Sequence, residues 1–332
     1  MMCKLYKIIS LCIIVFIFSS NKIEASNIDD NFELWLVSFK EKALKKGISQ
    51  KTLDLTFKDV NFLEQVIKYD RKQPEFFEDT ITYVSKRANL KRVKNAKKLL
   101  KKNNDLFNEI ENKFSVEKEI LLSLWGIETN FGKHVGKMDI ISSLATLSYD
   151  KRRRDFFSSQ LLILLQLIDR KLIEPNILFG SWAGAYGNFQ FMPSTIKNYA
   201  IDYDGNNKIE LKKSLPDSVA SAANYINKIG WKKGEPCFFR VKLEKKIKKK
   251  YINSSARNIK NRLNIRKWKK RGIVGFDDSL INSNLKAALI LPDGNENSPA
   301  YLVFRNYEKI LKWNRSLRFG ISVCTLSNKI KS

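Results

Sequence analysis

The chain has 332 residues, enough for one large domain or two ordinary ones, and its hydrophobic content is that of a globular protein. Lys and Arg number 61 against 34 Asp and Glu, so nucleic acid, a membrane surface and an anionic polymer are candidate partners; solvated surface lysines explain the charge equally well. The single histidine, His134, excludes a HExxH zinc site and any multi-histidine metal centre. Because no G-x-S-x-G motif is present either, we expect hydrolytic chemistry to depend on carboxylates.

The N-terminus has the pattern of a secretory signal peptide. Lys4 and Lys7 flank the start of an apolar run over residues 8–18, and a polar stretch leads to a cleavage site after Ala25. The run is short for a membrane span, and the leucine before Cys12 is a poor lipobox residue. We therefore expect an exported, periplasmic protein whose residues 1–25 are removed, without a lipid anchor.

Residues 26–114 are predicted to form a helical N-terminal region. Apolar spacing indicates a helix over residues 32–46 that ends at Gly47, followed by a short helix from Ser49 to residue 57. Pro74 interrupts or restarts the helical pattern. Residues 80–114 are strongly helical and basic, with one side expected to pack and the other to face water.

Residues 115–132 form an amphipathic helix that places a carboxylate where an apolar residue is expected. Ser115 is the expected N-cap, and Leu121, Trp125 and Glu128 share one face by their spacing. Burial beside aromatic rings near a helix C-terminus would raise the pKa of the Glu128 carboxyl, as a general acid requires. The alternative is that Glu128 lies at the edge of the apolar stripe and points into water.

Residues 133–171 are predicted to contain a loop, a short helix over 140–147 and a long apolar helix from Asp155. Between the helices lies a basic cluster, residues 151–154, which either binds anionic substrate groups or faces water. Residues 180–195 then combine three glycines with aromatic, amide and hydroxyl side chains. This composition suits a loop that lines a sugar-binding cleft, or alternatively a tight turn that packs its aromatic rings into the core.

Residues 202–210 resemble the first nine positions of an EF-hand calcium loop, with side-chain oxygens at positions 1, 3 and 5. Position 6 is Asn207 instead of glycine, which is tolerable because asparagine adopts left-handed conformations. Position 12 is Lys213 instead of glutamate, so Asp217 is the nearest substitute; its other role is in the first turn of a helix capped by Ser214. The candidate ligands are Asp202, Asp204, Asn206, the Lys208 carbonyl and Asp217.

From residue 237 the character changes to a small, basic, β-containing region. Strands are predicted over residues 238–243, 287–291 and 300–304, with the very basic residues 245–270 between the first two. Helical segments over 307–313 and 319–330 close the chain. Cys237 and Cys324, the cysteines that remain after cleavage, could pair in an oxidising compartment, but spacing alone does not show that they meet.

Taken together, these motifs resemble the lytic murein transglycosylase B family (glycoside hydrolase family 103), over roughly residues 30–330. The resemblance implies an α+β, predominantly helical fold: a lysozyme-like catalytic core with an N-terminal helical part and a small β-containing insert. The implied divisions are 26–114, 115–236 completed by 305–332, and 237–304. The motifs that carry it are residues 125–132 (W-G-I-E-T-N-F-G), 180–193, 215–217 with 224–225, 70–75 and 313–316.

The family activity is cleavage of the β-1,4 bond between N-acetylmuramic acid and N-acetylglucosamine in peptidoglycan, with a 1,6-anhydromuramoyl product. By resemblance, Glu128 is the single catalytic acid and base. Two departures are that Phe319 stands where a tyrosine can occur, and that the calcium loop carries amides and an extra residue before Asp217. The implied sugar-binding residues are Tyr83, Ser181, Gln190, Tyr225 and Asn314; the calcium positions are the five named above.

The expected partners are peptidoglycan glycan strands and other cell-wall enzymes, and the protein is expected to be a monomer. We expect catalysis to need no cofactor, and any bound calcium to be a structural ion. An alternative function is a non-catalytic peptidoglycan-binding protein on the same scaffold, against which the complete Glu128 motif argues. A basic nucleic-acid binder is a further alternative, against which the signal peptide argues.

Overall fold

The computed structural model describes residues 20–72, 77–175, 178–275 and 284–332, with the backbone alone for 20–30. The start of the predicted signal peptide, with its apolar run, and the Pro74 segment of the family motif therefore lie outside the described residues. Within the described ranges, no helix is both long and apolar enough to cross a membrane.

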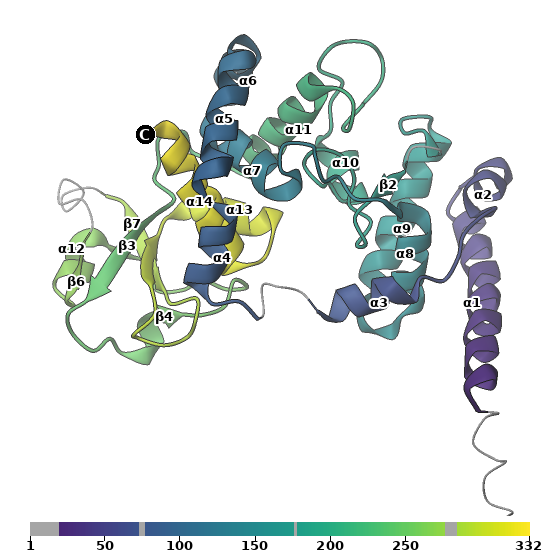
Figure 1. The fold of residues 1–332 in the computed structure, drawn as a ribbon, viewed down its shortest axis with the longest axis horizontal. Helices are drawn as coiled ribbons and strands as arrows, with labels where there is room; N and C mark the ends of the chain where they lie inside the picture. The colour runs from purple at the N-terminus through teal and green to yellow at the C-terminus, as the bar shows by residue number, and fades with distance from the viewer. Residues whose placement is uncertain (1–19, 73–76, 176–177, 276–283) are drawn as a thin grey trace, which may run out of the picture.

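Helices dominate the described chain and follow the predicted order (Figure 1). The stretch over residues 80–114 that was predicted to be helical forms three helices. Asn89 caps the second by accepting from the Arg92 N–H at 2.9 Å, and Asn103 separates the second from the third. The helices are α1 (Ser20–Lys45), α2 (Gln50–Phe57), α3 (Glu64–Arg71), α4 (Thr80–Arg87), α5 (Leu90–Lys102), α6 (Asn104–Phe114), α7 (Lys118–Thr129), α8 (Ile140–Tyr149), α9 (Arg154–Asp169), α10 (Pro193–Tyr199), α11 (Leu215–Lys228), α12 (Ile265–Lys269), α13 (Arg305–Trp313) and α14 (Leu317–Lys331), with 3-10 turns η2 (Lys151–Arg153) and η4 (Lys249–Tyr251).

The predicted N-cap of the Glu128 helix is wrong. Ser115 has left-handed backbone angles (φ 52°) and ends α6, whereas α7 begins at Lys118 after Glu117. The Glu117 carboxylate does not cap the helix; it accepts from the Trp231 indole N–H at 2.6 Å and from the Gly234 N–H at 2.7 Å. A long-range contact thus engages the side chain that stands at the cap position of α7.

The strands form a small sheet within the predicted β-containing region and a separate two-stranded ribbon. The ribbon pairs β1 with β2 and leads into the loop over residues 181–192. The larger sheet has the order β4-β7-β8-β3-β6, with β5 also paired to β7; the β4–β7 pair is parallel and the others are antiparallel. The strands are β1 (Met138–Asp139), β2 (Phe179–Gly180), β3 (Phe238–Leu243), β4 (Ile252–Asn253), β5 (Leu263–Asn264), β6 (Ile273–Val274), β7 (Lys286–Ile290) and β8 (Ala300–Val303).

The closing helix α14 organises the core. It packs against α4, α5, α7 and α13, so the two ends of the described chain share one hydrophobic cluster. In Figure 1, α4, α13 and α14 lie together at the centre, with the sheet on one side and α8, α9, α1 and α2 on the other. A second cluster, built around the buried Trp268, belongs to the β-containing region alone.

Several contacts join the β-containing region to the helical body, and two of them reach α14. Cys237 and Cys324 form a disulfide between the start of that region and α14, which answers the question that their spacing left open. Asp293, in the turn between β7 and β8, accepts from the Thr80 hydroxyl at 2.6 Å and from the Arg318 guanidinium at 2.7 Å. The region is therefore tied to both α4 and α14.

Candidate active site

Glu128 lies in the last turn of α7, on the face that the spacing predicts. Leu121 is fully buried and Trp125 is nearly so, while Glu128 is partly exposed. The helix ends because Asn130 and Phe131 both adopt left-handed angles, with φ of 50° and 61°. The carboxyl thus lies between the buried stripe and water, intermediate between the two sequence-based interpretations.

A close contact inside the motif explains its glycine. The Phe131 ring folds back over α7 and meets the Trp125 ring edge to face, with centroids 5.6 Å apart. A Cβ added at Gly126 would lie 2.8 Å from the tip of the Phe131 ring. Glycine therefore allows the reversed chain to pack directly against the helix that carries Glu128.

Asn188 joins the end of α7 to the loop over residues 181–192. The Thr129 hydroxyl donates to the Asn188 carbonyl oxygen at 2.7 Å, and the Trp125 indole donates to the Asn188 side-chain oxygen at 3.3 Å. The Asn188 amide in turn donates to the Ser218 hydroxyl at 3.1 Å. These buried hydrogen bonds fix the loop relative to Glu128, as a site with several fixed groups requires.

The second wall of the site is a group of aromatic rings around Trp313, the last residue of α13. The indole N–H donates to Glu128 Oε1 at 2.9 Å. Tyr225 stacks on the same indole with ring centroids 5.2 Å apart, and Phe191 lies 5.3 Å away at a tilt. Glu128 therefore has a neutral donor and an aromatic environment; the raised pKa that we expect for it stays a prediction.

The loop over residues 181–192 packs some of its rings into the core and leaves other side chains partly exposed. Tyr186, Phe189 and Phe191 are buried and join the main core, which agrees with the packing alternative for those rings. Burial raises the pKa of the Tyr186 hydroxyl to about 12, so that phenol stays neutral. Trp182 and Gln190 stay partly exposed and remain accessible to a ligand.

Four of the predicted sugar-binding residues are partly exposed: Ser181, Gln190, Tyr225 and Asn314. Tyr225 and Asn314 adjoin Trp313 by stacking and by sequence, and Gln190 precedes Phe191. The Gln190 amide donates to the Val135 and Gly187 carbonyl oxygens at 3.1 and 2.9 Å, which orients its side chain. Ser181 lies at the start of the loop, where its hydroxyl accepts from the Ala185 N–H at 3.0 Å.

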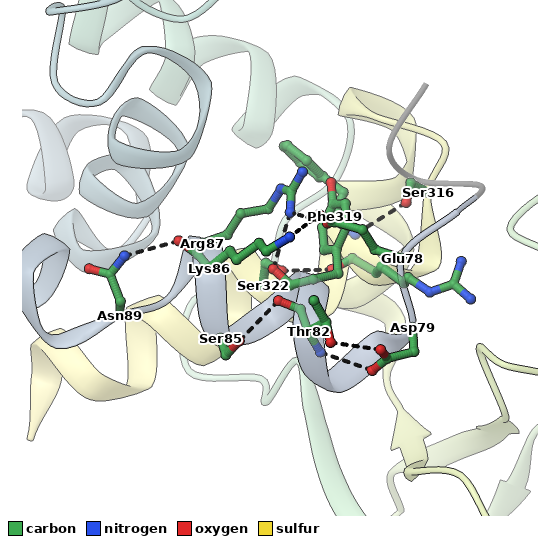
Figure 2. Close-up of polar contacts among 12 residues, drawn as sticks. Glu78, Asp79, Thr82, Ser85, Lys86, Arg87, Asn89, Ser316, Phe319 and Ser322 are labelled. Atoms are coloured by element: carbon green, nitrogen blue, oxygen red, sulfur yellow. Dashed lines mark hydrogen bonds and ion pairs between the residues drawn. The ribbon is translucent and has the colours of Figure 1, made fainter. Parts of the chain in front are cut away.

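Tyr83, the fifth of the predicted sugar-binding residues, is buried, with 1% of its surface exposed. The Arg87 guanidinium lies 3.4 Å from its ring centroid and is held by Glu78, which also binds Lys86 (Figure 2). These ion pairs join the segment before α4 to the last turn of that helix. Asp79 caps α4 by accepting from the Thr82 N–H at 2.9 Å (Figure 2). In this structure Tyr83 is therefore covered, with the Arg87 guanidinium over its ring.

Part of the basic cluster at residues 151–154 is paired with a buried carboxylate of α3. The Asp70 carboxylate, 2% exposed, accepts from the Arg152 guanidinium at 2.7 Å and lies 3.6 Å from that of Arg153. A hollow of about 610 Å³ opens beside this cluster, between α3 and the end of α8. It is separate from the aromatic centre around Trp313, because none of the rings named there lines it.

The acidic loop brings three of its five predicted calcium ligands together. Asp202, Asp204 and Asp217 each place a carboxylate oxygen within 4.8 Å of the others, and Asp217 is fully buried. Asn207 has a φ of 64°, as expected of an asparagine in the glycine position. Ser214 caps α11 by accepting from the Asp217 N–H at 3.2 Å, so Asp217 has both of its predicted positions.

Hydrogen bonds within the loop orient these oxygens. Asp202 accepts from the Gly205 and Asn207 N–H groups at 2.8 and 2.7 Å, and Asn206 accepts from the Lys208 N–H at 2.8 Å. The three carboxylates are hard oxygen donors, which suits calcium. The residues present therefore fit this ion.

Sequence reasoning missed two residues that build the site. Trp313 entered only as part of a family motif, and its contact with Glu128 spans 185 residues. Asn188 entered only as one polar residue of the loop, although it links Trp125, Thr129 and Ser218. Trp313 directly precedes the predicted sugar-binding residue Asn314, and Asn188 lies within the motif of residues 180–193. This proximity in the sequence was the available signal for either residue.

Comparison with known proteins identifies relatives of this chain. The sequence pattern described as "Transglycosylase SLT domain" matches residues 31–328. Membrane-bound lytic murein transglycosylase B of Escherichia coli (strain K12) is 39% identical over 132 residues, which cover 40% of this chain and 36% of that protein. The match thus spans little more than a third of the length of this curated relative.

Solved structures of other proteins are similar in fold to this chain over most of its length. SltB3 from Pseudomonas aeruginosa, in complex with NAG-NAM-pentapeptide, is 33% identical with a TM-score of 0.82, covering 91% of this chain and 80% of that one. A lytic transglycosylase from Escherichia coli in complex with calcium is 24% identical with a TM-score of 0.76, covering 91% and 93%; this likeness concerns the fold alone. The predicted fold class, α+β and predominantly helical with a lysozyme-like core, is confirmed. The chain belongs to the transglycosylase SLT domain family.

Proposed function

We propose that this protein is a lytic transglycosylase that cleaves the bond between N-acetylmuramic acid and N-acetylglucosamine and leaves 1,6-anhydromuramoyl ends. The observation that carries the proposal is Glu128, a partly exposed carboxyl in the last turn of α7 that accepts a hydrogen bond from Trp313 at 2.9 Å. Solved structures of SltB3 hold NAG-NAM-pentapeptide in one case and NAG-anhNAM-pentapeptide in another, which are substrate-like and product-like pairs for this reaction.

The reaction needs one carboxyl of the protein. Protonated Glu128 donates to the glycosidic oxygen, and the 2-acetamido group of the substrate shields the positive charge that develops at C1. The ionised Glu128 then accepts the proton of the muramoyl C6 hydroxyl, whose oxygen bonds to C1 and closes the anhydro ring. The carboxyl ends protonated as it began, so this route requires no cofactor and no nucleophilic partner.

We propose that Ser181, Gln190, Tyr225 and Asn314 bind the sugars. Their partial exposure and their position on the loop and around Trp313 support this role. Tyr83 joins them only in a state in which Arg87 has moved off its ring. The catalytic unit is then residues 115–236 with 305–332; the separate hydrophobic cluster of the β-containing region supports 237–304 as a distinct subdomain.

The Glu128→Gln variant tests the function. Incubated with purified sacculi, the folded variant should release no anhydro-muropeptides, since a glutamine side chain cannot supply the proton. Glu119→Gln, a neutralisation in the same helix, is the matched control and should keep full turnover. Retained turnover in Glu128→Gln contradicts the assignment.

Mass spectrometry of the same digest separates the alternatives. A hydrated reducing end in place of the anhydro end identifies a muramidase. Binding of the wild-type protein to sacculi without any product identifies a non-catalytic peptidoglycan-binding protein. A gel shift with nucleic acid that persists at physiological salt would revive the nucleic-acid binder.

We infer further that the acidic loop holds a structural calcium ion through Asp202, Asp204, Asn206, the Lys208 carbonyl and Asp217. The proximity of three carboxylates, one of them fully buried, supports this inference. Such an ion would link the loop before α11 to that helix, which also carries Tyr225. It would therefore support the shape of the site without taking part in proton transfer.

We propose a periplasmic location on the basis of the signal-peptide pattern, and attachment to the wall through excess positive charge. Lys245, Lys248 and Arg271 line a hollow of about 320 Å³ in the β-containing region, which supports a basic wall-facing surface. Because exposed charges are screened by salt, turnover on sacculi should fall as ionic strength rises. Turnover on a short, uncharged glycan should change little.

A further inference from the structure

The contact between Trp313 and Glu128 has a chemical consequence for the carboxyl. An indole N–H is a hydrogen-bond donor with no acceptor capacity. It lies 2.9 Å from Glu128 Oε1, so this oxygen must present a lone pair to it. In a protonated carboxyl, the oxygen that accepts best is the carbonyl oxygen. The acid proton is therefore favoured on the other oxygen, Oε2.

The indole is held in place by packing on several sides. Tyr199, Tyr225 and Trp313 form a continuous stack, with centroid distances of 4.5 and 5.2 Å and interplanar angles of 29°. Phe191 and Phe189 lie 5.3 and 6.1 Å from the same indole, tilted and edge-on. Rings in these arrangements attract each other and resist rotation of the indole about its side-chain bonds.

The backbone before Trp313 is fixed as well. The Tyr225 hydroxyl donates to the Lys312 carbonyl oxygen at 3.1 Å, so Tyr225 holds Trp313 both by its ring and by its hydroxyl. Burial raises the pKa of the Tyr225 hydroxyl to about 12, so this donor keeps its proton throughout the neutral range. The direction of the indole N–H is thus set by α10, α11 and α13 together.

We propose that Trp313 is the positioning residue of Glu128: its N–H holds Oε1 so that Oε2 both donates the proton to the glycosidic oxygen and takes it back from the C6 hydroxyl. This inference rests on the proposed transglycosylase function. Both protonation states of the carboxyl keep an acceptor at Oε1, so the hydrogen bond survives the whole cycle. The donor favours the ionised form more strongly, which moderates the effect of the aromatic surroundings.

A different role for Trp313 is a platform on which a sugar ring stacks. One face of the indole already stacks with Tyr225, which leaves less of the ring for a sugar. The two roles differ in kinetics. A lost platform weakens substrate binding and raises KM, whereas a lost positioning group lowers kcat and alters the pH profile.

Trp313→Phe tests the proposal, because phenylalanine keeps a ring in the stack and removes the N–H. We expect kcat on a defined glycan substrate to fall about 10- to 100-fold with KM within twofold, since misplacement of a reacting group costs rates of this order. The limb of the pH–rate profile that reports Glu128 should move to higher pH, because a donor to the ionised form is gone.

Trp35→Phe is the matched control. Trp35 is also partly exposed and stacked, on Phe39 at 5.1 Å, but lies in α1. Its rate and pH profile should equal those of the wild type. An unchanged pH profile in Trp313→Phe, a rise in KM at constant kcat, or an equal loss in Trp35→Phe each overturns the proposal. If the wild type makes no anhydro product at all, the proposed function itself has failed.

A second measurement applies even if Trp313→Phe does not fold. Of the six tryptophan indole N–H resonances of the wild type, one should shift in an NMR titration as Glu128 changes charge, and that shift should vanish in Glu128→Gln. A shift that persists in Glu128→Gln belongs to another ionisable group and overturns the proposal. The partly or fully buried ionisable groups on the helices that pack against α7 are Arg92, Glu111, Asp217, Tyr225 and Arg318.

Discussion

Two acidic centres of this protein hold their carboxylates in different ways. Asp217 is fully buried, and its two oxygens accept from the backbone N–H groups of Tyr203 and Glu210 at 2.8 and 2.9 Å. Glu128 is partly exposed and accepts from a side-chain donor, the Trp313 indole, at 2.9 Å. The Asp217 carboxylate is thus held by backbone groups, whereas the Glu128 carboxylate is held by a side chain among aromatic rings.

The difference matches what each group is proposed to do. Backbone N–H groups are rigid donors that favour an ionised carboxylate, which suits a structural acceptor or a calcium ligand. An acid that gives up and regains a proton needs a partner that tolerates both states, and a neutral indole does so. We therefore expect Asp217→Asn to lower the stability of the protein, and Glu128→Gln to abolish turnover while leaving the stability almost unchanged.

The largest effect on stability is expected for Asp217→Asn. The amide keeps the shape of the carboxylate, but its NH₂ group faces a backbone N–H that has lost its acceptor. We expect the free energy of unfolding to fall by about 1–3 kcal/mol, and the Tm by a few degrees. Thermal unfolding with a chelator present measures this loss without a contribution from bound metal.

Glu128→Gln serves as the comparison in the same experiment. Its amide oxygen can still accept from the Trp313 indole, so its Tm should stay within about one degree of the wild type. Equal losses of Tm in the two variants would remove the distinction between the two centres.

Calcium should sharpen the comparison, with an effect confined to the acidic loop. An ion that binds only the folded state adds about 2.7 kcal/mol at a hundredfold excess over its Kd, so the Tm should rise with calcium and fall back with a chelator. Asp204→Asn removes one carboxylate of the cluster and should reduce the rise, while Glu128→Gln should keep it.

Magnesium is the natural control, because it is smaller and retains water ligands, so a smaller rise is expected. A Tm that does not respond to calcium, or that responds equally in Asp204→Asn, contradicts the proposed ion site.

The features of the fold and of the site that could be predicted from the sequence are those that depend on neighbouring residues. Local patterns sufficed for α2, capped by Ser49, for strand β3, and for Ser214 as the cap of α11 above Asp217. Each of these depends on hydrogen bonds or side-chain alternation within a few residues. The acidic loop and the helix position of Glu128 are local features in the same sense.

The parts that sequence reasoning missed depend on contacts between distant segments. Ser115 ends α6 instead of capping α7, and Glu117 at the cap position is engaged by Trp231, more than a hundred residues away. The indole that contacts Glu128 and the pairing of Asp70 with Arg152 are of the same kind. Periodicity shows which face of a helix is apolar, but it does not identify the side chain that a distant element places there.

The smallest expected effect concerns Asp169, a carboxylate whose donors all favour its charged form. It accepts from the Ser49 hydroxyl at 2.5 Å, the Thr52 hydroxyl at 2.6 Å and the Ser49 N–H at 3.2 Å, and these bonds hold its pKa below the ordinary 3.8. Since the pKa is depressed in the folded state, its contribution to stability is complete above about pH 4 and is lost as the pH falls through the lower folded value.

Thermal unfolding of wild type and Asp169→Asn between pH 6 and pH 2.5 checks this sign. The Tm difference between them should be small and constant above about pH 4, and should shrink as the wild-type carboxylate is protonated. A difference that grows toward acid would mean that these donors favour the protonated form. We expect the pKa of Glu128 to be raised and that of Asp169 to be lowered. If the donors of Asp169 favoured its protonated form, hydrogen bonds would not explain this difference in pKa. The difference would then have to come from the aromatic rings beside Glu128.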